Sequence, residues 1–187
     1  MPHLSILKNS LNMFLRLTGY HIMCMLVSIS ILAFFPDITG GLMAQFINIG
    51  IIVVLPYLTM WKWGDTDYNK IAHGHKKKDV WLGLKVGAIA YAPCIVLGLL
   101  LIAARAGALS HSFQSWYRFL CTPFLPLNQS LMPTTLSLVE CGYSRIIISA
   151  LTPLIVPISL GVAYYMGVNR ISFSETFGFA KHNKKTV

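Results

Sequence analysis

Residues 17–35 read LTGYHIMCMLVSISILAFF, and this stretch decides the fold class of the chain. It contains no Asp, Glu, Lys or Arg. A helix of about 20 apolar residues crosses the roughly 30 Å hydrocarbon core of a bilayer, because an α-helix rises ~1.5 Å per residue. The stretch therefore predicts a transmembrane helix.

The composition of the whole chain agrees with this interpretation. Of its 187 residues, 55% are hydrophobic and 11% are charged, whereas soluble domains carry about 25% charged residues. A soluble protein of this size could not bury so much apolar surface in one core. The net charge of +9 fits lysines that face the anionic cytoplasmic leaflet. We expect the lipid bilayer and its anionic headgroups as partners, and not nucleic acid, because no basic stretch is interleaved with a stacking surface of aromatic residues.

Four apolar runs are long enough to cross the membrane, at residues 17–35, 42–61, 80–104 and 146–168. Backbone polar groups cannot stay unpaired in lipid, so each run must be helical. The alternating pattern of barrel strands is missing from the sequence. We predict an all-α integral membrane protein, with residues 1–187 forming a single transmembrane helical domain of four spans. Residues 62–79 and 105–145 are its two longer connections.

The distribution of positive charge predicts the orientation. Eleven of the fifteen Lys and Arg residues lie before the first span, in the 62–79 loop or after the fourth span. Three lie in the 105–145 segment, and Lys85 lies just inside the third span. The positive-inside rule then places both termini and the 62–79 loop in the cytoplasm, and it makes 105–145 the outer segment of a multi-pass plasma membrane protein.

Two segments outside the spans have a membrane-surface pattern. Residues 4–15 place leucines and Phe14 on one helical face, which predicts an N-terminal amphipathic helix in the interface; the alternative is that it extends the first span. Residues 113–127 are rich in aromatics and interrupted by prolines, which predicts an interfacial or re-entrant cap; a broken fifth span is the alternative. Residues 172–175, SFSE, fit a capping box that opens a short helix after the fourth span.

Small residues and prolines form a stripe on each of the last two spans. Helices in lipid associate through close packing at small residues, so we predict that both stripes are contact surfaces, within this chain or with another membrane subunit. The prolines also predict kinks, at Pro56 in the second span, at Pro93 in the third, and at Pro153 and Pro157 in the fourth. The stripe residues are Gly83, Gly87, Ala90, Cys94 and Gly98 in the third span and Ser149, Pro153, Pro157 and Gly161 in the fourth.

The segment 61–79, WKWGDTDYNKIAHGHKKKD, contains the candidate polar site. Its D-x-D-x-N opening matches an EF-hand loop, but Lys replaces the required Gly at position six and the required Glu at position twelve, so an EF-hand is rejected. A looser cation site at Asp65 and Asp67 and a transition-metal site at His73 and His75 are the weaker alternatives to solvated side chains.

The acidic side chains of this segment need another explanation. Topology calls for lysines on the cytoplasmic side, but it does not call for carboxylates. We therefore predict that Asp65, Asp67 and Asn69 contact a partner, or else cap a helical turn or pair with the neighbouring lysines.

No two of the four cysteines are spaced as a CxxC motif. Cys24 and Cys94 fall within spans, where a cysteine serves as a small apolar residue. Cys121 and Cys141 fall in the outer segment, where a disulfide could form. A bridge between them would close a loop of about 20 residues and add roughly 3 kcal/mol.

Residues 64–87, GDTDYNKIAHGHKKKDVWLGLKVG, and residues 167–172, GVNRIS, carry a family resemblance. They resemble uncharacterised small multispan membrane proteins of Gram-positive bacteria, in which a GDxDxN stretch leads through a basic segment to GLKxG. The resemblance implies the topology of a small multispan protein and no known activity.

The residues inside the spans limit the function. Proton- and ion-coupled carriers usually need a carboxylate near the membrane midplane, and no span contains one there. HExxH, GxSxG and P-loop motifs are missing from the sequence, so we expect neither an enzyme nor a bound cofactor. The first hypothesis is a non-enzymatic accessory or scaffold subunit of a membrane complex. The alternatives are a small-molecule carrier, such as the substrate-binding component of an energy-coupling-factor transporter, which has six spans, or a cytoplasmic-side sensor that uses the polar loop.

Overall fold

The computed structural model describes residues 2–35, 37–110 and 112–171, and every regular element within them is a helix. Three helices are long and apolar enough to cross a membrane: Ile6–Phe34, Thr39–Ala72 and Tyr143–Val168. A fourth candidate is the bent pair Leu82–Ala90 and Ala92–Arg105. The prediction of a helical membrane protein is confirmed, with three spans or four if the bent pair is one span. The capping box predicted at 172–175 lies outside the described residues.

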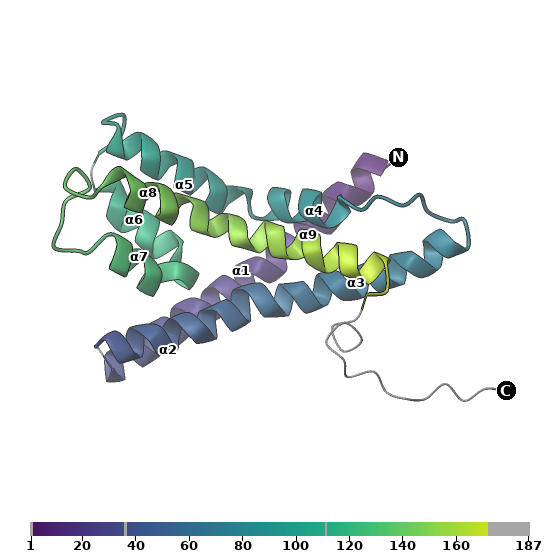
Figure 1. The fold of residues 1–187 in the computed structure, drawn as a ribbon, viewed down its shortest axis with the longest axis horizontal. Coiled ribbons are helices and arrows are strands. Elements are labelled where there is room, and N and C mark those ends of the chain that lie inside the picture. Colours follow the sequence, from purple (N-terminus) through teal and green to yellow (C-terminus); the bar gives the residue numbers. More distant parts are fainter. Residues whose placement is uncertain (1, 36, 111, 172–187) are drawn as a thin grey trace.

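The helices run back and forth between two ends of an elongated bundle (Figure 1). The start of α1 (Pro2–Phe34), the 73–81 connection and the end of α9 (Ile155–Val168) lie at one end. The turn between α1 and α2 (Ile38–Ile49) lies at the other end. We call these the basic end and the cap end. The remaining elements are η1 (Gly50–Val54), α3 (Leu55–Ala72), α4 (Leu82–Ala90), α5 (Ala92–Arg105), α6 (Phe113–Leu120), η2 (Thr122–Phe124), α7 (Leu125–Leu131), α8 (Tyr143–Leu151) and η3 (Thr152–Leu154).

Helix α1 corrects the prediction of a separate N-terminal amphipathic helix. The chain is helical without interruption from Pro2 to Phe34, because the sequence between Pro2 and Gly19 contains no helix-breaking residue. Met13 and Leu17 are buried in the main core, which also contains residues of α4. Residues 4–15 therefore extend the first span, the alternative to an interfacial helix.

Helix α3 corrects the boundary of the predicted 62–79 loop. The helix continues to Ala72, and only residues 73–81 connect it to α4. Gly64 does not break the helix, because it is a contact point with α9. A β-carbon placed there would lie 2.6 Å from the Tyr164 carbonyl oxygen and 3.0 Å from the Gly167 Cα. Gly64 and Gly167 thus let two helix backbones touch, and α3 and α9 form the most extensive helix pair.

The third predicted span is broken by a 63° bend between α4 and α5. Pro93 lies in the first turn of α5, where it cannot donate a backbone hydrogen bond to the preceding turn. The predicted kink at Pro93 is confirmed. The helix is not broken at Pro56. The wide helical turn η1 precedes this proline, and one helix continues through it from Thr39 to Ala72.

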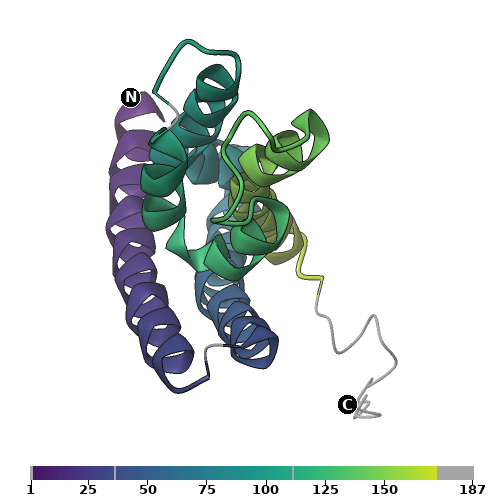
Figure 2. The ribbon, with the colours of Figure 1, turned by 90° about the vertical axis from the view of Figure 1, so that its left-hand side faces the viewer.

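The predicted outer segment, 105–145, forms a packed cap and not a fifth span. Helices α6 and α7 have 8 and 7 residues, and a helix of that length extends only about 12 Å. Figure 2 shows α6 and α7 between α1 and α8, at the cap end of the bundle. Gln45 of α2 connects to η2 and α7, since its amide donates to the Pro123 carbonyl (3.3 Å) and accepts from the Leu127 N–H (3.2 Å).

Most of the two small-residue stripes lie between the third and fourth predicted spans. A β-carbon at Gly87 would lie 3.0 Å from the Pro157 Cα, and one at Gly161 would lie 3.1 Å from the Leu84 Cβ. Gly83 lies against Leu160 and Tyr164, and Gly98 against Ala150. The other stripe residues lie as follows: Ala90 is buried in the main core, Cys94 packs against that core, Pro153 is buried in η3, and Ser149 bonds to Asn128 of α7.

Candidate functional site

The polar segment that the sequence singled out, residues 61–79, forms the last turns of α3 and most of the 73–81 connection, at the basic end. Because its α3 part is helical, Asp65 and Asn69 lie on one face and Asp67 points about 200° away from them. Asp67 is buried among α3, α4 and α9, whereas Asp65 is partly exposed and Asn69 is exposed. The acidic cluster therefore divides into two contacts with different partners.

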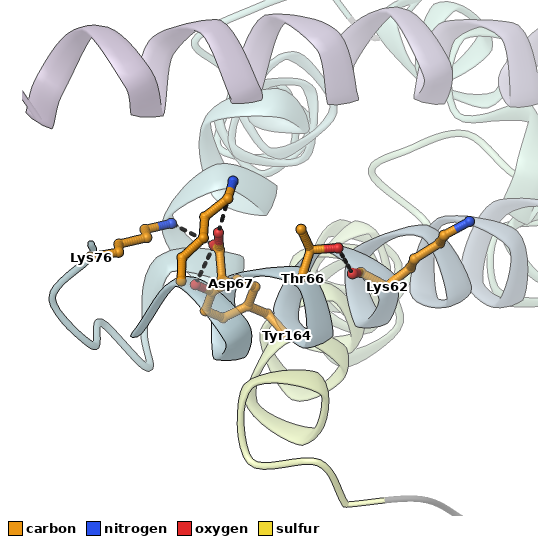
Figure 3. Close-up of polar contacts among 6 residues, drawn as sticks. Lys62, Thr66, Asp67, Lys76 and Tyr164 are labelled. Atoms are coloured by element: carbon orange, nitrogen blue, oxygen red, sulfur yellow. Dashed lines mark hydrogen bonds and ion pairs between the residues drawn. The ribbon is translucent and has the colours of Figure 1, made fainter. Parts of the chain in front are cut away.

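Asp67 is the centre of the first contact (Figure 3). The hydroxyl of the buried Tyr164 on α9 donates to its carboxylate at 2.9 Å. Lys76 of the 73–81 connection forms an ion pair with the same oxygen, and Lys70 lies 3.9 Å from the other. The side chains of Asp67 and Lys76 are 13% and 32% exposed, so this pair is screened less than a surface ion pair. One carboxylate thus joins α3, α9 and the basic connection.

Arg170 makes the second contact, just after the end of α9. Its guanidinium donates to Asn69 Oδ1 at 2.7 Å and lies 3.5 Å from Asp65 Oδ1. The same group stacks 4.2 Å above the ring centre of Tyr68. Arg170 has a φ of 53°, a left-handed conformation that usually favours glycine after a helix end. Its three contacts with α3 offset that preference.

A polar pocket of about 290 Å³ opens beside Asp67. Asn9 and Asn12 of α1 contribute amides to it, and Thr66 and Lys70 of α3 contribute a hydroxyl and an ammonium. Trp63 and Tyr164 give it aromatic walls. The lining combines hydrogen-bond donors and acceptors, charges of both signs from Asp67 and Lys70, and apolar side chains. Such a lining suits a small polar or amphipathic molecule.

The predicted metal ligands do not gather into one site. Across residues 2–35, 37–110 and 112–171, no three His, Cys, Asp or Glu side chains come together in a way that could hold a metal ion. The rings of His73 and His75 stack with their centres 6.4 Å apart, and His73 Nδ1 lies 2.7 Å from the Asn69 carbonyl oxygen. His73 thereby caps the C-terminal end of α3, where the last carbonyl groups have no donor within the helix.

Cys121 and Cys141 lie in one hydrophobic cluster under the cap. Both Cys121 and Cys141 are buried and free, so the predicted disulfide is not formed in this structure. The same region is held by side chains from three helices: Tyr117 donates to the Ser149 carbonyl at 2.6 Å, and Ser149 donates to Asn128 at 2.5 Å. Polar bonds, and not a bridge, connect the cap to α8.

Four residues of the site were missed by the sequence reasoning. Tyr164 has the pattern of an interfacial aromatic, and Arg170 was counted only as a topology charge. Asn9 and Asn12 recur at i and i+3, which places two amides on one face of α1, and this spacing is the one signal that could have identified them.

No family model, no curated protein and no solved structure matches this chain.

Proposed function

We propose that this chain is a non-enzymatic accessory or scaffold subunit of a complex in the plasma membrane. Both termini and the basic end face the cytoplasm, and the cap faces outward. The count of Lys and Arg supports this orientation, since the basic end includes Lys70 and the 76–78 lysines while the cap end has few positive charges.

The uneven burial of the candidate spans is the observation that carries this proposal. In the most apolar window of Tyr143–Val168, 50% of the residues are buried inside the chain. The corresponding shares are only 17% for Ile6–Phe34 and 22% for Thr39–Ala72. Most residues in the apolar windows of α1 and of the helix Thr39–Ala72 therefore lie outside the packed interior, where lipid or another membrane subunit must cover them. We call α1 together with α2 and η1 the hairpin.

Two glycines of this hairpin favour a protein as part of that cover. A β-carbon at Gly19 or Gly50 would have no neighbouring atom within 4 Å, so neither glycine is explained by packing inside the chain. Helix pairs in membranes approach most closely at such small residues. Gly64, Gly83 and Gly98, in contrast, each lie against another helix of the chain.

The positions of the carboxylates disfavour an ion-coupled carrier. Among the described residues, Asp37 and Glu140 lie in connections at the cap end, and Asp65, Asp67 and Asp79 lie at or near the basic end. The middle of the bundle thus offers no carboxylate to bind a coupling ion.

The test is site-specific photo-crosslinking in native membranes. A photoreactive residue at Leu26 or Phe46, which are 62% and 75% exposed on the hairpin, should give a discrete product with another membrane protein. The same residue at Ile155, on the outer face of α9, is the matched control and should give no such product. Crosslinks to lipid alone at all three positions would refute the scaffold role.

The polar pocket beside Asp67 favours a second function, as a small-molecule carrier or the substrate-binding component of a transporter. This function requires that the purified protein retains a small polar molecule, which mass spectrometry of the extracted ligand would identify. Asn12→Leu would place an apolar side chain at the pocket and should abolish that retention while leaving the hairpin crosslinks unchanged. Recovery of a lone monomer that carries a metabolite would favour this function over the scaffold.

A further inference from the structure

An apolar groove of about 350 Å³ lies on the outer surface between α4 and α9. Its lining is almost entirely apolar and comes from Val80, Trp81, Leu84, Ile158, Gly161, Val162 and Tyr165. Because Gly161 has no side chain, α9 approaches the Leu84 side chain closely at the floor of the groove. Ile158 and Val162 leave about half of their surface exposed along its wall.

One end of this groove meets the basic end of the bundle. Tyr165 lines the groove, and Asn169 follows it by one helical turn at the end of α9. The ammonium of Lys78 donates to Asn169 Oδ1 at 2.7 Å, so a positive charge lies just beyond the groove's apolar wall. Trp81, which is 63% exposed, belongs to the same end of α4. An exposed tryptophan beside a lysine is typical of headgroup level in a membrane protein.

The charges around this end are unbalanced. Lys85 pairs with Asp79 at 2.8 Å, and each neutralises the other. Lys78 contacts a neutral amide, and no carboxylate of the described residues lies within ion-pair distance of it. Lys77 adds a further exposed positive charge next to it. The groove thus ends in net positive charge that an anion would complement.

We propose that the α4–α9 groove binds one anionic phospholipid. An acyl chain lies along Leu84, Ile158 and Val162, and the phosphate lies at Lys78. A phospholipid is the occupant that combines a hydrocarbon chain with a negative charge at headgroup height, whereas a partner helix would need no lysine at this point. The proposal rests on the membrane location given above, and it is independent of the scaffold role.

The experiment is native mass spectrometry of the full chain, released from vesicles that contain equal amounts of phosphatidylglycerol and phosphatidylcholine. We expect one phosphatidylglycerol per chain to be retained in preference to phosphatidylcholine. Lys78→Gln should lower that preference about fivefold, as expected for one basic residue near an anionic lipid. Lys62→Gln, an exposed lysine of α3 outside the groove lining, is the charge-matched control and should leave it unchanged.

A second variant tests the groove itself. Ile158→Trp adds bulk on the lipid-facing wall, so it should fill the groove without disturbing the core and abolish retention of phosphatidylglycerol. Leu99→Trp, at a similarly exposed position of α5 outside the lining, should have no effect. Equal retention of both lipids, unchanged retention in Lys78→Gln or Ile158→Trp, or a second protein chain in the groove in place of lipid would each overturn the proposal. The hairpin crosslinks should persist in Ile158→Trp, which separates this test from that of the scaffold role.

Discussion

Replacing Asp67 by alanine should destabilise the folded protein by about 2–4 kcal/mol, although the residue lies near the surface of the basic end. The buried hydroxyl of Tyr164 would lose its acceptor, which costs about 1–3 kcal/mol for an unpaired buried group. The partly exposed ion pair with Lys76 adds about 1 kcal/mol, between the values for surface pairs and for broken buried pairs. Asp67→Asn keeps an acceptor for Tyr164, so it should cost only about 1 kcal/mol.

The assay is unfolding in mixed micelles with increasing sodium dodecyl sulfate, followed by tryptophan fluorescence. Trp63 lines the pocket beside Asp67 and reports on this region directly. Asp65→Ala is the matched control, because its pair with Arg170 is about half exposed and should cost less than about 1 kcal/mol.

A double-mutant cycle separates the Tyr164 bond from other effects of the substitution. Tyr164→Phe should be less damaging in the Asp67→Ala background than in the wild type, since the hydroxyl then has no acceptor to lose. The reasoning would be refuted by an Asp67→Ala protein as stable as the wild type. Additive effects of the two substitutions would refute it equally, because they would mean that the two side chains do not interact.

Three further predictions concern helix packing, the end of α9 and the orientation. Gly64→Leu should prevent α3 from packing on α9 and abolish the monodisperse peak in gel filtration. Gly19→Leu should elute as the wild type does, because a β-carbon added at Gly19 has no atom within 4 Å, and a normal peak for Gly64→Leu would contradict the close contact. Arg170→Ala should lower stability by only about 1 kcal/mol, because its ion pair is exposed, but it should speed hydrogen exchange over residues 68–72; unchanged exchange would show that the contacts with α3 do not hold this end. In a variant freed of its native cysteines, an impermeant maleimide added to intact cells should label Leu109→Cys but not His75→Cys, and the opposite pattern would invert the orientation.

The sequence was sufficient for the class of fold, because runs of apolar residues report directly on the membrane thickness. It misplaced the end of the second span, because a glycine followed by polar residues has the pattern of a helix end, whereas Gly64 is required by the backbone of α9. That contact joins residues a hundred positions apart, and local pattern contains no information about it. The extension of α1 was only the alternative interpretation for the same reason, since packing of Met13 and Leu17 favours it.

The candidate site shows the same division between local and distant information. The unusual carboxylates were visible in the sequence, but their tasks depend on Tyr164 and Arg170, which lie about a hundred residues away. Lysines gathered at one end of a bundle repel one another, and residues 73–79, which carry three of them, contain no apolar side chain that could pack into the core. Asp67 holds one of these lysines against the bundle, and Asp65 with Asn69 holds Arg170. The carboxylates thus hold the end of α3, the connection and Arg170 together, and they leave Lys78 free of a carboxylate partner at the end of the α4–α9 groove.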